Sequence, residues 1–160
     1  MDVTADLIFV KNITFLLSLG KQIKFTAVEN MKDRRAGKLF KGTNKIIRIY
    51  NNQSVNIDTM FMDNEFEVLI PRLNSELEIT LNTTAANEQI TKNKRHIQVI
   101  KERIWSIYNF LPYNNIPNHI IVHMVKCTVL WLNALPVGSG VSTTFLPRTT
   151  MVGITINLNR

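Results

Sequence analysis

The chain has 160 residues, 45% of them hydrophobic and 19% charged, a balance that fits one globular domain and excludes a disordered protein. Its formal net charge of +7 at pH 7 favours a polyanionic partner, either nucleic acid or an anionic membrane surface. Cys127 is the only cysteine, which excludes an intramolecular disulfide and indicates a reducing, intracellular compartment, nuclear or cytoplasmic.

The first third of the chain predicts three short strands with tight connections. Each is a β-rich apolar run, and the runs are Leu7 to Val10, Thr14 to Leu19 and Ile23 to Val28. Because three such segments follow one another so closely, we expect an antiparallel meander.

The middle of the chain alternates between helical and strand patterns. Apolar residues from Leu39 to Tyr50 recur at helical spacing, although two glycines weaken that helix by roughly 1 kcal/mol each relative to alanine. A fourth strand, Val55 to Met62, leads to Asp63. A short helix from Phe66 follows, which Pro71 must break or kink, and then a fifth strand from Leu77 to Leu81.

Two helices dominate the C-terminal half. The first, Asn93 to Tyr108, carries one apolar stripe, and the second runs from Pro117 to about Leu135. The second is the most apolar helix, yet it is shorter than the roughly 20 residues of a membrane span, so we expect no membrane insertion. A late strand near Thr155 to Leu158 is a weak signal. The order predicts an α/β fold with a mixed five-stranded sheet, a β-meander plus added strands, flanked by helices.

Two aspartates follow or precede apolar runs in the first and fourth predicted strands. Asp6 and Asp63 would meet at one edge of the sheet if these strands lie side by side. Close carboxylates repel each other unless a cation bridges them, which makes a Mg²⁺ or Mn²⁺ site the chemical reason for such a pair. The alternative is that Asp6 is a polar strand position and Asp63 caps a turn, and spacing alone favours this alternative.

Several segments resemble the integrase core of copia-type long-terminal-repeat retrotransposons, over nearly the whole chain from Thr4 to Gly153. The segments are Asp6 to Asn12, Met62 to Glu67, Leu81 to Glu88, Lys94 to Arg103, Trp131 to Pro136 and Pro147 to Thr149. The resemblance implies one RNase H-like domain over residues 1–153, a C-terminal tail at 154–160, and DNA integration by strand transfer. It also implies catalytic and metal-binding acids at Asp6 and Asp63, with a third acid at the position of Lys94.

Lys94 departs from that family pattern, because an ammonium replaces the expected glutamate. One unit charge pair at about 4 Å is worth about 4 kcal/mol at an effective dielectric constant near 20, so the change should remove at least one metal ion. We therefore expect weak Mg²⁺ or Mn²⁺ binding and impaired catalysis, with Lys94 free to pair with Asp6 or Asp63. The alternative is an active strand-transferase that uses Glu102 or Glu88 as its third ligand.

DNA is the expected partner, because the predicted helix after Asn93 is strongly basic. Its candidate DNA-binding residues can contact phosphates without base specificity, and they are Lys92, Lys94, Arg95, Gln98, Lys101 and Arg103. The resemblance further allows a homodimer, a place in a larger polyprotein, or a non-catalytic dimerisation module built on the helix from Pro117 to Leu135.

A zinc site is a weaker hypothesis. His119, His123 and Cys127 recur at i, i+4 and i+8 on one helical side, as zinc ligands sometimes do. No fourth ligand is evident, so ordinary core packing is the favoured interpretation and no zinc is expected. Nor do we expect the zinc-binding domain that precedes such integrase cores, since Met1 lies five residues before Asp6.

Overall fold

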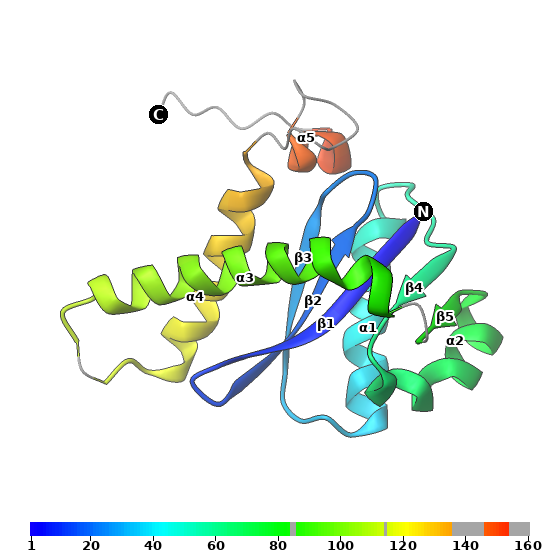
Figure 1. Cartoon of the computed structure of the whole chain (residues 1–160), viewed down its shortest axis with the longest axis horizontal. Coiled ribbons are helices and arrows are strands. Elements are labelled where there is room, and N and C mark those ends of the chain that lie inside the picture. The colour runs from blue at the N-terminus through cyan, green and yellow to red at the C-terminus, as the bar shows by residue number, and fades with distance from the viewer. Residues whose placement is uncertain (84–85, 114, 136–145, 154–160) are drawn as a thin grey trace.

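A mixed five-stranded sheet forms the centre of the molecule, in a computed structural model that describes residues 1–83, 86–113, 115–135 and 146–153 (Figure 1). The strand order is β3-β2-β1-β4-β5. The strands are β1 (Asp2–Val10), β2 (Ile13–Gly20), β3 (Thr26–Met31), β4 (Thr59–Phe61) and β5 (Thr80–Asn82). The first three pair antiparallel, whereas β4 pairs parallel with both β1 and β5. The predicted meander with two added strands is confirmed.

The turns of the meander explain where its strands begin. Lys11 and Asn12 have φ values of 47° and 66°, the two positive values that a type I′ hairpin turn requires. The third strand begins at Thr26, so the predicted start at Ile23 is wrong. Lys24 has a φ of 59°, and the Gly20 N–H donates to the Phe25 carbonyl across a closed turn, so the segment before Thr26 belongs to the turn.

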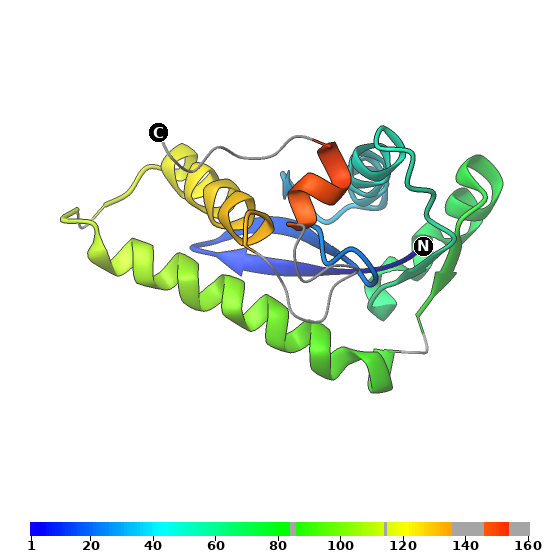
Figure 2. The same ribbon diagram turned by 90° about the horizontal axis from the view of Figure 1, so that it is seen from above.

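Helices cover both faces of the sheet, with α3 on one side and α1 on the other (Figure 2). The apolar core under α1 contains Val3, Ala5 and Leu7 of β1, and the core under α3 and α4 contains Ile8 and Val10. The helices are α1 (Ala36–Asn51), the 3₁₀ helix η1 (Asn64–Leu69), α2 (Ile70–Leu77), α3 (Ala86–Phe110), α4 (Asn118–Asn133) and α5 (Pro147–Val152).

Several predicted boundaries shift. The fourth strand is only three residues long, and the fifth begins at Thr80, because Leu77 still belongs to α2 and Glu78 ends that helix at a φ of 55°. Pro71 lies in the first turn of α2, where its missing N–H costs nothing, and η1 precedes it. The long helix begins seven residues before Asn93, and α5 had no clear sequence signal. The late strand and the tail at 154–160 lie outside the described residues.

Helix α4 lies along the edge strand β3 and closes that side of the sheet. Near the end of α4, the Asn133 side-chain amide donates to the Thr26 carbonyl at 2.7 Å, and its oxygen accepts the Thr26 N–H at 2.8 Å. A side chain thus supplies both hydrogen bonds that a further strand would have made. Among the described residues, no helix is both long and apolar enough to cross a membrane.

Candidate functional site

Asp6 lies on β1, and Asp63 lies two residues beyond the end of the neighbouring parallel strand β4. The β1–β4 ladder pairs Asp2 with Thr59 and ends with Thr4 opposite Phe61. The backbone of Asp63 is still extended, with φ −72° and ψ 162°, so the register, if it continued for two more residues, would set Asp63 opposite Asp6. Adjacent strands are about 4.8 Å apart, so this register would bring the two aspartate backbones close together.

The pleat of the sheet predicts that both aspartates share a face. Ala5 of β1 and its register partner Met62 both belong to the core under α1. Side chains alternate along a strand, so Asp6 belongs to the opposite face, which α3 covers, and Asp63 would share that face if the alternation continues beyond β4. Asp6 is half-buried and Asp63 is exposed.

Each aspartate accepts the backbone N–H of the next residue. Asp6 Oδ1 accepts from Leu7 N at 2.8 Å, and Asp63 Oδ1 accepts from Asn64 N at the same distance. Asp63 is the N-cap of η1, so the capping role that spacing favoured is observed. A carboxylate has roughly four acceptor positions, and one N–H uses only one of them. An aspartate that caps a helix can therefore also bind a cation through its remaining acceptor positions.

Helix α3 crosses the sheet at Asp6. A small cavity is lined by Asp6, by its cross-strand neighbour Leu17 and by Ile97 of α3. These shared lining residues show that α3 passes over β1 near Asp6. Residue 94 lies one helical turn before Ile97. The side chains of Lys92, Lys94 and Glu88 lie outside the described residues, so the predicted convergence of Lys94 on the aspartates rests on this helical register alone.

His96 anchors the same turn of α3 to the start of β3. Its Nε2 lies 2.8 Å from the Thr26 hydroxyl, and the ring is partly buried. Burial lowers the pKa of His96 below its ordinary value of 6.5, and the nearby charge of Lys24 lowers it further. The neutral imidazole is thus the form that holds α3 against the sheet.

The carboxylates present fit a divalent cation only in part. Mg²⁺ is usually held by one or two carboxylates together with water and substrate oxygens, and Asp6 with Asp63 could supply that minimum. Within the described ranges, no group of three or more histidine, cysteine, aspartate or glutamate side chains could hold a metal ion. The two aspartates are therefore the residues that would hold a cation, and the chemistry it would supply is charge neutralisation between them.

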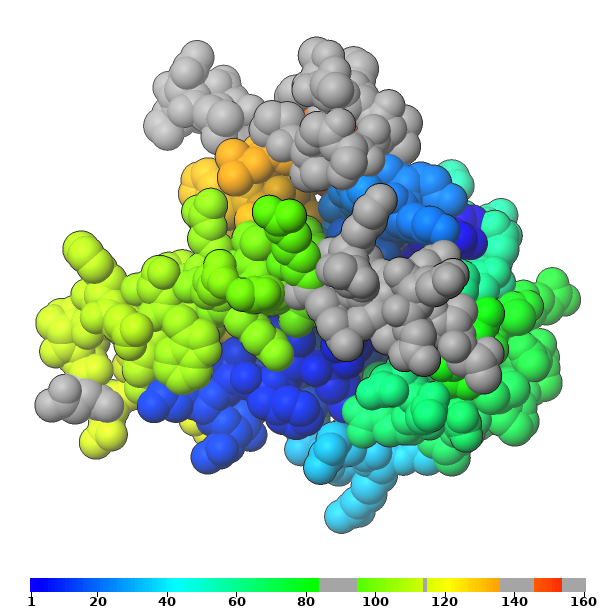
Figure 3. Space-filling model, in the orientation of Figure 1, coloured from blue at the N-terminus to red at the C-terminus, as the bar shows by residue number. Residues whose placement is uncertain are grey.

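The outer side of α3 is basic. Arg95, Lys101 and Arg103 are exposed, and none of them forms an ion pair with any side chain that the structure describes. Figure 3 shows the second half of α3, in yellow-green, on the molecular surface beside the dark blue strand β1. These cations lie on the face of the sheet that carries Asp6.

Glu102 lies away from the aspartates. It is exposed and accepts a hydrogen bond from Gln98 Nε2 at 2.9 Å. Its neighbours Ile100 and Ile104 are buried in the core with Ile8 and Val10, farther along β1 than Asp6. The Glu102 side chain is therefore not placed next to the two aspartates.

The three candidate zinc residues on α4 are all exposed. His119, His123 and Cys127 lie outside the apolar core, so the expectation of ordinary core packing is wrong. The residues that α4 contributes to this core include Ile121, Val125 and Val129, which lie on another side of the helix.

Some contacts near the site had little sequence signal. The Lys11 ammonium lies 4.8 Å from the ring centre of Tyr108 and 5.8 Å from that of Trp105, which ties the end of α3 to the β1–β2 turn. The aromatic residues at helical spacing were visible in the sequence, but their cationic partner comes from a turn about 95 residues earlier.

Among the solved structures with a similar fold are two retroviral integrase catalytic cores. The catalytic core domain of BIV integrase matches with a TM-score of 0.69 and 13% identity, over 95% of this chain and 93% of that one. The HTLV-2 integrase catalytic core domain, in complex with magnesium and in a trimeric form, matches with a TM-score of 0.64 and 14% identity, over 94% and 95%. No protein-family model and no curated protein matches the sequence. The chain therefore has the RNase H-like fold of integrase cores.

Proposed function

We propose that this chain is a DNA-binding domain of the integrase-core type, related to copia-type retrotransposon integrases, whose strand-transfer chemistry is impaired. The observation that supports the proposal is the exposed basic side of α3 over the face of the sheet that carries Asp6, with Asp63 just beyond the end of the neighbouring strand β4. Arg95, Lys101 and Arg103 would contact phosphates along a duplex, with Gln98 as a polar neighbour. Lys92 and Lys94 would extend this surface toward the aspartates.

The impairment follows from charge. An integrase-type site places acids around two divalent cations at the scissile phosphate, and the ammonium of Lys94 replaces one of those acids. The positive charge takes the place of part of the cation's charge, so DNA can still be attracted to the site. The fold and the DNA affinity can thus persist without efficient phosphoryl transfer.

The test of DNA binding is fluorescence anisotropy with a labelled duplex at several salt concentrations. We expect the logarithm of the association constant to fall linearly with the logarithm of the salt concentration. Replacing Arg95, Lys101 and Arg103 with glutamine should reduce that slope by about 2.7, or roughly 0.9 for each lost phosphate contact. An unchanged slope in this variant would refute α3 as the DNA-binding element.

The test of impairment is a strand-joining assay in Mg²⁺ and in Mn²⁺ together with thermal melting. We expect no joining by the native chain and no change of its melting temperature with Mg²⁺. Lys94→Glu should gain stability from the ion, because a ligand that binds only the folded state at ten times its Kd adds about 1.4 kcal/mol. Robust joining by the native chain would overturn the impairment.

The alternative of an active enzyme depends on another acid. Glu102→Gln is the discriminating variant if joining is observed, since a third metal ligand cannot be lost without loss of activity. The hydrogen bond from Gln98 and the exposed position of Glu102 make this the less favoured route.

A second candidate function, homodimerisation through α4, is supported by its exposed apolar residues. Ile120, Leu130 and Trp131 are 38%, 45% and 59% exposed, on the side of α4 turned away from the core. Sedimentation equilibrium of the native chain and of Trp131→Glu tests it. We expect a dimer for the native chain and a monomer for the variant, and a native monomer at high concentration would contradict this role.

A further inference from the structure

A second basic surface lies on the other face of the sheet, around α1. Residues 32–48 hold seven of the nineteen lysines and arginines of the chain but only one of its twelve acids. That acid, Asp33, accepts the backbone N–H of Arg35 at 3.0 Å just before α1. Nearly all of the net charge of +7 can therefore be traced to this short segment.

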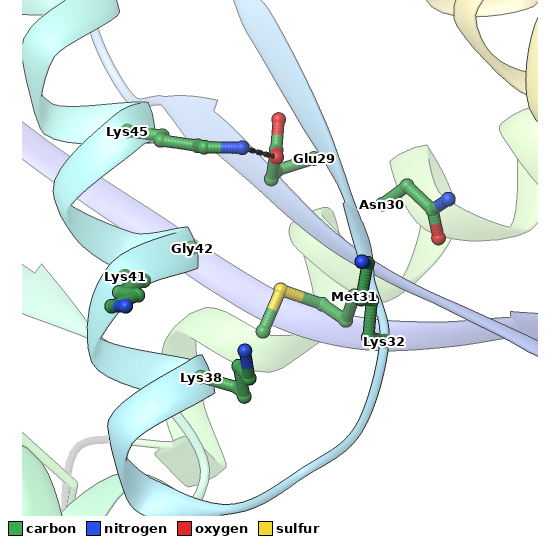
Figure 4. A pocket seen from close by; sticks show the side chains of 8 residues that line it. All are labelled: Glu29, Asn30, Met31, Lys32, Lys38, Lys41, Gly42 and Lys45. Atoms are coloured by element: carbon green, nitrogen blue, oxygen red, sulfur yellow. Dashed lines mark hydrogen bonds and ion pairs between the residues drawn. The ribbon is translucent and has the colours of Figure 1, made fainter.

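The lysines of this segment surround a cavity between α1 and the edge strand β3 (Figure 4). Lys38, Lys41 and Lys45 come from α1, and Lys32 directly follows β3. The volume is about 170 Å³, below the roughly 300 Å³ at which drug-sized ligand sites begin, so the cavity suits a small group such as a phosphate.

Packing between the helix and the strand shapes the cavity. Met31 reaches from β3 toward α1, as Figure 4 shows, and a Cβ at Gly42 would lie 2.4 Å from the Met31 sulfur. The glycine thus lets α1 approach the strand closely. At one end, Lys45 forms an ion pair with Glu29, so that cation is already neutralised.

The other lysines of the cavity have no such partner. Lys32, Lys38 and Lys41 are exposed, and none of them makes an ion pair with a side chain within the described ranges. Lys38 also lies in the first turn of α1, which contains no acidic residue and has no side-chain cap. Cations repel the positive end of the helix dipole, so this arrangement costs stability that a bound anion would offset.

We propose that Lys32, Lys38 and Lys41 form a phosphate-binding site for the sugar–phosphate backbone of a nucleic acid, separate from the basic side of α3. This inference extends the proposed DNA binding to a second surface and rests on it. The two surfaces lie on opposite faces of the sheet, because α1 and α3 cover opposite faces (Figure 2). One chain can then contact two duplex segments at once.

The length of the basic row favours a polyanion over a single free phosphate. From Lys38 to Arg48 the helix rises about 15 Å, and Lys38, Lys41 and Arg48 provide cations along it, whereas Lys45 between them is already paired with Glu29. Phosphates on one strand of DNA follow at about 3.4 Å along the duplex axis, so such a row can follow several of them. Ile49 is the single exposed large apolar side chain described on α1, which leaves little of the apolar surface by which proteins recognise peptides.

The experiment compares three variants of the full chain in DNA binding. The first replaces Lys32, Lys38 and Lys41 with glutamine, and the second replaces Arg95, Lys101 and Arg103. The control replaces Lys21, Lys126 and Arg148, which removes the same net charge at positions that belong to neither set. Circular dichroism establishes that each variant is folded, and Lys38→Gln alone serves if the triple variant is not. Anisotropy against salt and the stoichiometry with a short duplex are measured for each.

We expect the native chain to bind two short duplexes, and each of the first two variants to bind one. The α1 variant should also lose about tenfold in affinity for a long duplex at moderate salt, with a salt slope reduced by about 2.7. The control variant should change the affinity for a long duplex and the salt slope much less. Equal effects of the α1 variant and the control would overturn the site, because only overall charge would then matter.

A further experiment with inorganic phosphate distinguishes a site for free phosphate from a site for the phosphates of DNA. If millimolar phosphate stabilises the native chain but not the α1 variant, while both bind DNA equally, the site takes free phosphate and the inference is wrong. If only the α3 variant loses DNA binding, the proposed function stands and the second surface fails. If the native chain does not bind DNA at all, both fail.

Discussion

The hydrogen bonds between Asn133 and Thr26 predict a large effect of a small change. Asn133→Ala removes the partner of both backbone groups of Thr26, at a site where both residues are buried. A buried backbone group left unsatisfied costs about 1–3 kcal/mol, so the two groups together give about 2–6 kcal/mol. Water that reaches the vacated strand edge lowers this cost, and we expect a loss of about 3 kcal/mol.

Urea denaturation followed by circular dichroism measures this loss. A domain of this size shifts its melting temperature by about 2–4 °C for each kcal/mol, so thermal melting should fall by roughly 6–12 °C. Asn109→Ala is the matched control, because Asn109 is exposed on α3 and its replacement should change the stability by less than about 0.5 kcal/mol.

Asn133→Asp separates the two hydrogen bonds. The aspartate can still accept the Thr26 N–H, but at neutral pH it sets a carboxylate against the Thr26 carbonyl. Protonation restores a donor, so this variant should regain stability as the pH falls. A loss below about 1 kcal/mol in Asn133→Ala, with an unchanged m-value, would refute the view that α4 is fastened to the edge of the sheet by this side chain.

Two further predictions concern the candidate site. The pKa of His96 is lowered by burial, so the unfolded chain takes up the proton first as the pH falls below its ordinary value of 6.5. The free energy of unfolding should therefore keep its full value above pH 6.5 and decrease as the pH falls below 6.5. His96→Gln should remove part of this pH dependence, which urea titration at each pH measures. Asp63→Ala should cost about 1 kcal/mol because η1 loses its cap, whereas Asp63→Asn should cost much less, since asparagine caps as well as aspartate. Equal losses in the two variants would contradict the capping role.

The pattern of the fold was largely predictable from sequence, because most elements have strong periodicity. The meander, α1 and α4 all follow from apolar spacing, and the order of elements is the predicted one. The two parallel strands β4 and β5 were placed with the wrong boundaries, since each has only three residues and owes its strand geometry to the neighbours it pairs with. Local sequence contains little information about such short, tertiary strands.

The site was predictable only in part, for a related reason. Adjacency of the first and fourth strands could be anticipated, but the register that aligns Asp6 with Asp63 depends on where the ladder begins, at Asp2 and Thr59. The contact between His96 and Thr26 spans 70 residues and leaves no periodic trace. The basic segment before and within α1 was present in the sequence as scattered lysines, and only the packing of Met31 against Gly42 gathers them around one cavity.

Asp63 has a sufficient structural reason to be an aspartate, but capping does not explain Asp6. Asp6 is half-buried on the face that otherwise carries Ile8 and Val10, where a charged side chain is costly unless it is paired. The part of α3 that passes this position contains Lys94 one turn from Ile97. We therefore expect the two residues to be coupled through charge.

A double-mutant cycle of Asp6→Asn and Lys94→Glu, measured by urea denaturation with a metal chelator present, tests this coupling. In the native background Asp6→Asn should destabilise the fold, because the ammonium loses its partner. In the Lys94→Glu background the same change should stabilise it, because two carboxylates no longer repel. A unit charge pair at about 4 Å is worth between roughly 1 kcal/mol in water and 4 kcal/mol near a protein surface. The change in the free energy of unfolding caused by Asp6→Asn should lie within this range in each background. If Asp6→Asn has the same sign and size in both backgrounds, residues 6 and 94 do not meet, and the charge replacement cannot be the cause of any lost activity.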